Sequence, residues 1–193
     1  MGYGGYSTED HAKITQVRST MRAEEVFTAR KLHPLMDPKG VSLRESRDSA
    51  EHPNSTPIAF VLDETGSMGG IPRSLAKDEL PLFMECLLNA GVPDPQVLFA
   101  AVGDAKCGEK APIQVGQYES TAQGMDQWLT WTYLESGGGG NGGESYDLAA
   151  YFLARHTETD SLKIRGKKAY AFFTGDDDPF PVVSAREVET HFG

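Results

Sequence analysis

The sequence predicts an α/β protein with a doubly wound, mostly parallel sheet that follows an N-terminal extension. Three observations predict this fold class. Short, continuous apolar runs at 58–62 and 97–102 have the length and composition of strands buried on both faces, and a third run at 169–173 predicts another strand. Amphipathic helical segments lie between these runs, and each run ends in a polar loop. Residues 1–56 lack this alternation, so we divide the chain into an extension, 1–56, and a domain, 57–193.

The extension is expected to contain one helical segment and one long loop. The segment 10–32 spaces its apolar residues as a helix does, with arginine and glutamate between them. The segment 34–57 is polar and rich in turn formers such as Pro38 and Gly40, which predicts a loop. Such a segment must lie on the surface of its own domain or reach a neighbour.

The first half of the domain is predicted to alternate strand and helix. The run 58–62 is the first strand, and Pro72 can start the helix that follows it. We expect a kink at Pro81 inside this helix and an end at Gly91. The run 97–102 predicts a second buried strand, and 113–115 predicts an edge strand.

The second half continues the alternation. Residues 125–131 predict another helix, and the run 137–143 contains six glycines in seven residues. This run opens into a helix that has Tyr146, Ala149, Ala150 and Leu153 on one stripe. The run 169–173 predicts the last strand, and residues 183–192 begin one more helix.

Polar loops follow three of the predicted strands directly, at 63–67, 103–104 and 174–178. In a parallel sheet such loops meet beyond the carboxyl ends of the strands, where ligands bind at a switch point in strand order. The first loop spaces Asp63, Thr65 and Ser67 as D-x-T-x-S. A carboxylate and two hydroxyls are hard oxygen ligands, which favour Mg²⁺, Mn²⁺ or Ca²⁺ over zinc or copper. The sequence therefore predicts a divalent-metal site here, and the simpler alternative is a turn that caps a helix.

The motifs of this domain resemble those of the von Willebrand factor A (vWA) family. The segment 61–68, V-L-D-E-T-G-S-M, resembles the first motif of its metal-ion-dependent adhesion site, abbreviated MIDAS. The Gly-rich run with its helix start, 137–149, resembles the segment that brings the second part of that site, and 172–176 resembles the third. The similarity covers about 57–180. The runs R-E-S-R-D-S, G-D-A and G-G-N-G-G-E-S-Y are also similar to those of a group of bacterial and phage vWA proteins.

The resemblance implies a vWA or Rossmann-like fold and a set of metal ligands. Asp63, Thr65, Ser67 and the loop of Asp176 would bind the cation, with waters completing the shell. The family usually has a threonine ligand in the Gly-rich loop, but 137–143 contains none, so Asn141 or Glu144 is expected to substitute. The third motif is T-G-D-D-D rather than T-D-G, which makes Asp176 the best match and Asp177 the second choice.

The resemblance also implies a function, a metal-ion-dependent protein–protein interaction module. An acidic residue of a partner would fill the open position of the metal. Many cytoplasmic bacterial members of the family act beside AAA+ ATPases or inside larger assemblies, so a protein partner of that kind is expected. A complete vWA domain continues through another strand and helix, which predicts that this domain is incomplete at its C-terminus or is completed by a partner.

Two alternatives stay open for the same residues. A Mg²⁺-dependent phosphohydrolase of the haloacid dehalogenase type also has an aspartate after its first strand. Its pattern D-x-D-x-T requires a general acid where this chain has Thr65, so we predict no catalytic residue. The chain would otherwise be a structural or assembly subunit whose metal site is vestigial.

Composition restricts the partners and the compartment. Eighteen Lys and Arg against 28 Asp and Glu give a net charge of −10, which argues against binding to nucleic acid. No apolar run approaches the roughly 20 residues that cross a bilayer, and the first residues lack a signal peptide. The two cysteines, Cys86 and Cys107, are far apart, which fits a reducing compartment. We therefore expect a cytoplasmic protein without membrane contact.

Overall fold

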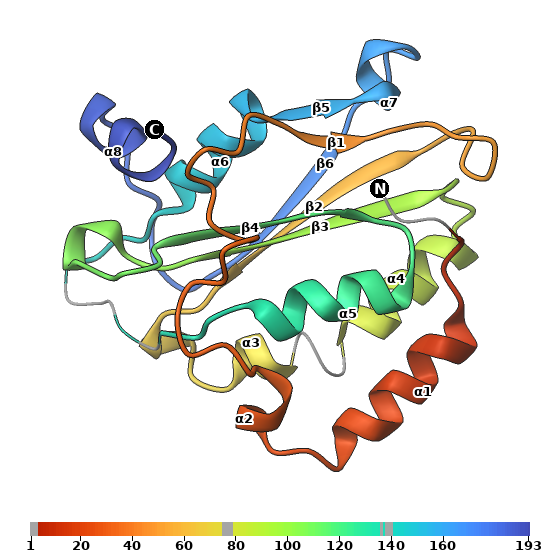
Figure 1. Cartoon of the computed structure of the whole chain (residues 1–193), viewed down its shortest axis with the longest axis horizontal. Coiled ribbons are helices and arrows are strands. Elements are labelled where there is room, and N and C mark those ends of the chain that lie inside the picture. Colours follow the sequence, from red (N-terminus) through yellow and green to blue (C-terminus); the bar gives the residue numbers. More distant parts are fainter. Residues whose placement is uncertain (1–3, 75–78, 136, 138–140) are drawn as a thin grey trace.

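The computed structural model describes residues 4–74, 79–135, 137 and 141–193 and contains a four-stranded open sheet in the order β4-β3-β2-β6 (Figure 1). The strands are β2 (Thr56–Asp63), β3 (Pro95–Val102), β4 (Ile113–Glu119) and β6 (Tyr170–Thr174). The three strands predicted from apolar runs pair in parallel, with β2 between β3 and β6. β2 and β3 are mostly buried, whereas β6 is an exposed outer strand. The predicted edge strand, β4, is antiparallel to β3, so the sheet is mostly parallel.

Helices cover both faces of this sheet, as the predicted fold class requires. The helices α4 (Leu80–Asn89) and α5 (Ala122–Trp131) lie on one face, and α1 (Thr8–Ser19) packs outside them (Figure 1). The helices α6 (Tyr146–Arg155) and α8 (Ala185–His191) lie on the other face. Each face has its own apolar core: Ile58, Phe99, Met84 and Met125 on the α4 side, and Val61, Leu98, Leu148 and Phe152 on the α6 side.

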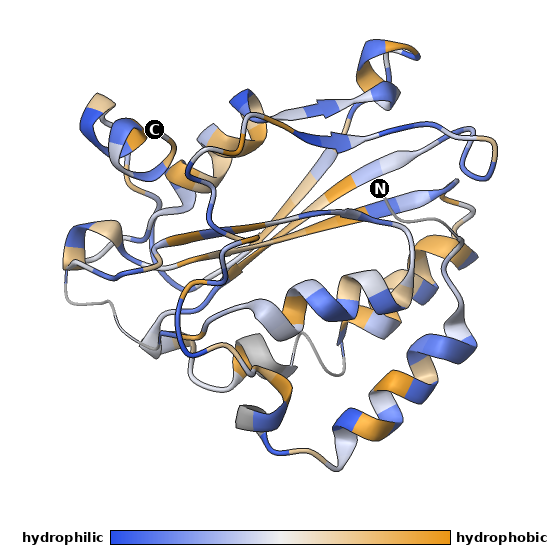
Figure 2. Cartoon of the chain, in the orientation of Figure 1, coloured by the Kyte–Doolittle hydropathy of each residue, from blue (hydrophilic) through white to orange (hydrophobic). Residues whose placement is uncertain are grey.

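The central strands supply both cores at once. Successive side chains of a strand point to opposite faces, so a strand buried on both faces needs apolar residues at consecutive positions. Figure 2 shows β2 and β3 as the apolar centre of the molecule. The α/β class is confirmed.

A second, two-stranded parallel sheet corrects the prediction that 34–57 is entirely loop. It pairs β1 (Arg44–Ser46) with β5 (Thr157–Thr159), next to the short helix α7 (Asp160–Lys163). The residues of β1 are polar and carry no apolar alternation, so the pattern could not show a strand. Ion pairs fix this region instead, since the Arg47 guanidinium binds Glu158 and lies 2.8 Å from Asp160.

The N-terminal extension packs on its own domain. Its helical part is shorter than predicted, because α1 ends at Ser19 and only α2 (Ala23–Val26) follows within 10–32. The side chains of Phe27 and Met36 are buried in the core on the α4 side. Arg18 forms an ion pair of 2.8 Å with Asp126 of α5. The part of the extension up to Met36 therefore covers the α4 face of the sheet, whereas Val41 packs on the α6 side.

The helix predicted after the first strand corresponds to two described helices on either side of residues 75–78. The structure has a short α3 (Ile71–Ser74) and then α4, which begins at Leu80 with Pro81 in its first turn. Proline suits a first turn, because the backbone N–H it lacks would have no partner there. Residues 75–78 lie outside the described residues. No described helix has the length and apolar character that crossing a membrane would require.

Candidate metal centre

The predicted metal motif lies in the turn that leaves β2. Asp63 is the last residue of this strand and is fully buried. Its Oδ1 accepts hydrogen bonds from the backbone N–H of Thr65 at 2.9 Å and from the Thr65 hydroxyl at 2.6 Å. The turn therefore folds back on the carboxylate, and positions 63 and 65 face one point.

Hydrogen bonds extend this turn to the loop after β6. The hydroxyls of Thr65 and Ser67 lie 3.0 Å apart, and the Ser67 hydroxyl donates to Asp176 Oδ1 at 3.1 Å. The parallel pairing of β2 with β6 brings the two loops to the same end of the sheet. The structure thus joins Asp63, Thr65, Ser67 and Asp176, the four residues of the predicted first and third motifs.

The other oxygen of Asp63 is held by a residue that the sequence did not single out as part of the site. The Tyr146 hydroxyl, at the start of α6, donates to Asp63 Oδ2. Burial, followed by this hydrogen bond, raises the pKa of Tyr146 above its usual range. The hydroxyl lies directly over Gly175, where an added Cβ would overlap it. Tyr146 looked like an apolar position on the helix stripe, and periodicity carries no information about its hydroxyl.

The two candidates from the Gly-rich loop have different positions. Asn141 donates through Nδ2 to Asp104 Oδ2 at 2.8 Å, so it is bound to the loop after β3 and not to the 63–67 turn. Residues 138–140 lie outside the described residues. The loop still reaches the first motif, because the carbonyl of Gly137 accepts from the N–H of Gly66 at 2.9 Å.

Glu144 lies at the start of α6, between the loop after β3 and the loop after β6. We call the loops that follow β2, β3 and β6 the rim of the sheet. Glu144 is fully buried, and neither of its carboxylate oxygens has a hydrogen-bond partner among the described residues. Its N–H donates to the carbonyl of Asp178 at 2.9 Å, which ties the start of α6 to the loop after β6. Burial, followed by the nearby carboxylates of Asp63 and then Asp104, raises the pKa of Glu144 to about 8.

Two more glutamates that the sequence did not indicate support the rim. Glu64 is buried and accepts from Gln114 Nε2 at 2.8 Å and from the N–H of Glu135 at 3.1 Å. Burial raises its pKa well above the usual value. Glu109 accepts from the N–H of Asp104 at 2.6 Å. Neither residue belongs to a periodic pattern, so only the folded arrangement shows these roles.

The donor set fits a hard cation. Within the described part of the chain, no three His, Cys, Asp or Glu side chains form a metal-holding group. A cation at the 63–67 turn would have only two carboxylate ligands, Asp63 and Asp176. The hydroxyls of Thr65 and Ser67 and water would supply the other oxygens. Oxygen donors of this kind suit Mg²⁺, Mn²⁺ or Ca²⁺.

The pKa of Glu144 predicts how stability depends on pH. Its usual value is 4.5 and its value in the folded chain is about 8, so between these limits the folded state holds a proton that the unfolded state releases. The free energy of unfolding in EDTA should therefore fall as pH rises through this window, by at most about 1.4 kcal/mol per pH unit from this group. Urea unfolding at a series of pH values measures the effect. Glu144→Gln should flatten the profile, and an unchanged profile in this variant would assign the dependence to another group.

Neither a protein-family model nor a curated protein matches this chain.

Proposed function

We propose that this chain is a metal-ion-dependent protein–protein interaction module of the vWA type. In this proposal Asp63, Thr65, Ser67 and Asp176 bind one divalent cation, Mg²⁺ or else Mn²⁺ or Ca²⁺. An acidic residue of a protein partner then completes the coordination. The observation that carries the proposal is the hydrogen bond from Ser67 to Asp176, which links two loops 109 residues apart in the chain.

Electrostatics supports a cation at this rim. Asp63, Asp104 and Glu144 are all fully buried, and burying a carboxylate costs several kcal/mol unless it is compensated. Hydrogen bonds offset this cost for Asp63 and Asp104, but the carboxylate of Glu144 accepts none from the described residues. A divalent cation would lower the free energy of all three carboxylates together.

Hydroxyl ligands support binding over hydrolysis. Two of the four proposed ligands are neutral hydroxyls, and water would complete the shell, so a carboxylate of a partner can replace a bound water. A phosphohydrolase of the haloacid dehalogenase type would need a carboxylic acid where Thr65 stands, and the Thr65 hydroxyl is already bound to Asp63. An AAA+ ATPase or a larger assembly remains a proposal for the partner, based on the family resemblance alone.

Mn²⁺ binding tests the proposed ligands directly. Free Mn²⁺ is measured by electron paramagnetic resonance while the protein is titrated. Ser67→Ala removes one oxygen ligand, and Asp176→Asn removes one negative charge. Each should raise the Mn²⁺ dissociation constant about tenfold or more, and tenfold corresponds to about 1.4 kcal/mol. Glu9→Gln, which alters an exposed carboxylate on α1, is the matched control and should bind as the wild type does. Equal affinities in all four proteins would exclude this metal site.

Acetate binding tests whether the bound metal keeps a coordination position open for a carboxylate of a partner. Acetate is the simplest carboxylate, and in the Mn²⁺ complex it should displace a bound water and lower the proton relaxivity of the solution. Turnover of p-nitrophenyl phosphate would favour the phosphohydrolase instead. Mn²⁺ binding without an acetate effect would leave a metal site that does not accept a partner carboxylate.

A further inference from the structure

The outer strand β6 has an uncovered edge and apolar side chains. Among the described strands it pairs only with β2. Its residues Tyr170, Phe172 and Phe173 are 56%, 41% and 42% exposed. A sheet edge with free backbone groups and exposed apolar side chains is a template for pairing with another strand. The opposite edge differs, because β4 is mostly buried and its Val115 bonds to Met36 of the extension.

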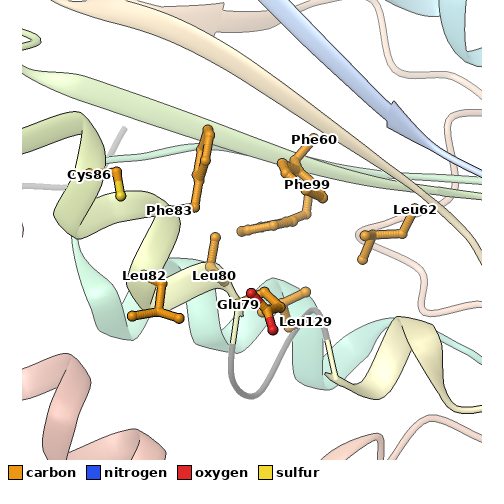
Figure 3. A pocket seen from close by; sticks show the side chains of 9 residues that line it. All are labelled: Phe60, Leu62, Glu79, Leu80, Leu82, Phe83, Cys86, Phe99 and Leu129. Atoms are coloured by element: carbon orange, nitrogen blue, oxygen red, sulfur yellow. The ribbon is translucent and has the colours of Figure 1, made fainter. Parts of the chain in front are cut away.

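Apolar recesses flank β6 on both faces of the sheet. On the α4 side a pocket of about 360 Å³ is lined by Phe60, Leu82 and Phe83 among others (Figure 3). Leu82 is 54% exposed, and the ring of Phe172 lies 5.4 Å from that of Phe83. On the α6 side Phe173 lines a second recess of about 390 Å³. An incoming strand would therefore need apolar side chains on both of its faces, as β6 itself has.

Charges of opposite sign stand at the two ends of β6. Lys167 and Lys168 precede the strand, the acidic run 176–178 follows it, and all of these residues are exposed. A second copy of the strand in antiparallel orientation reverses this order. With Phe172 opposite its own copy, Lys168 faces position 176 of the other chain and Lys167 faces Asp177. A parallel copy would instead place lysine beside lysine and aspartate beside aspartate.

We propose that two copies of this chain associate along β6, antiparallel, about a twofold axis at Phe172. The two sheets then become one continuous sheet. A twofold axis perpendicular to the sheet keeps corresponding faces together, so Leu82 and Phe172 of both copies meet on the α4 side. The lysines of each copy lie against the acidic run of the other, which selects this orientation although each chain carries a net charge of −10. The proposal does not depend on the metal site.

Disulfide trapping tests the strand pairing. Cys86 and Cys107 are exposed and are first replaced by serine. In that background Phe172→Cys should form an intermolecular disulfide under mild oxidation, because the two copies of position 172 face each other. Tyr170→Cys, which changes an exposed residue on the same face, is the matched control. Its two copies would lie about 14 Å apart in the antiparallel register, beyond the reach of a disulfide.

Sedimentation velocity of the 193-residue chain measures the association itself. The wild type should change from a monomer to a dimer as its concentration rises. Lys167→Glu or Asp177→Lys should weaken the dimer about tenfold, because like charges then face each other in both copies of this pair. Combining the two changes restores opposite charges at positions 167 and 177 and should restore the dimer. A single chain at every soluble concentration, or a Tyr170→Cys disulfide as efficient as that of Phe172→Cys, would overturn the proposal.

Discussion

Asp63→Ala is expected to abolish stabilisation of the protein by divalent cations. At a metal concentration a hundred times the dissociation constant, binding should stabilise the wild type by about 2.7 kcal/mol. For a chain of this size that corresponds to a rise of about 5–11 °C in melting temperature. Alanine removes the buried carboxylate on which Thr65 and Tyr146 converge, so the variant should show no rise. Thermal unfolding in EDTA, Mg²⁺, Mn²⁺ and Ca²⁺ measures both proteins.

The same experiment separates the ligand role of Asp63 from its structural role. In EDTA the alanine variant should itself be less stable by about 1–3 kcal/mol, because buried donors lose their acceptor. Asp63→Asn retains an acceptor oxygen and most of the shape, so it should recover part of this loss without recovering the metal response. A metal response that survives in Asp63→Ala would place the cation elsewhere. No response in the wild type would contradict the metal site.

Gly175→Ala should destabilise the protein by about 2.5–6 kcal/mol and weaken metal binding as well. The added methyl group would overlap the Tyr146 hydroxyl and press on its buried ring. Overpacking of this kind costs about 1–3 kcal/mol, and a hydrogen bond to a charged group contributes about 1.5–3 kcal/mol. The ring must move, so Asp63 loses its Tyr146 donor. Urea unfolding in EDTA measures the first effect, and Mn²⁺ titration measures the second.

Gly5→Ala is the control for the glycine substitution. A Cβ at Gly5 meets nothing within 4 Å, so this variant should stay within about 0.5 kcal/mol of the wild type. Tyr146→Phe removes only the hydroxyl and should lower metal affinity with a smaller loss of stability. Wild-type stability and Mn²⁺ affinity in Gly175→Ala would show that Tyr146 does not position Asp63.

The parts of the fold that depend on local pattern could be predicted from the sequence. The runs 58–62, 97–102 and 169–173 are apolar at consecutive positions, and all three form strands of one sheet. Their pairing brings Ser67 and Asp176 together, as the loop positions indicated. Strand β1 could not be predicted, because ion pairs of Arg47 support its region and no periodicity marks them.

Residues whose role depends on distant partners were predicted less well. Asn141 is predicted as a substitute metal ligand, and its side-chain amide donates to Asp104, a partner that the pattern of a Gly-rich loop could not indicate. Tyr146 and Glu64 are buried polar residues whose partners lie 83 and 50 residues away, or farther, in the chain. The spacing of residues along one segment cannot show such long-range hydrogen bonds.

The position of β6 in the sheet has a consequence for how the protein is synthesised. β2 ends at Asp63, but its partner β6 begins only at Tyr170, so among the described strands one side of β2 has no neighbour until residues 170–174 have left the ribosome. Non-local strand pairing of this kind is slow, and a bare apolar strand is prone to aggregate meanwhile. Nascent chains stalled before residue 170 should therefore recruit chaperones, whereas chains stalled well beyond residue 178 can close the sheet.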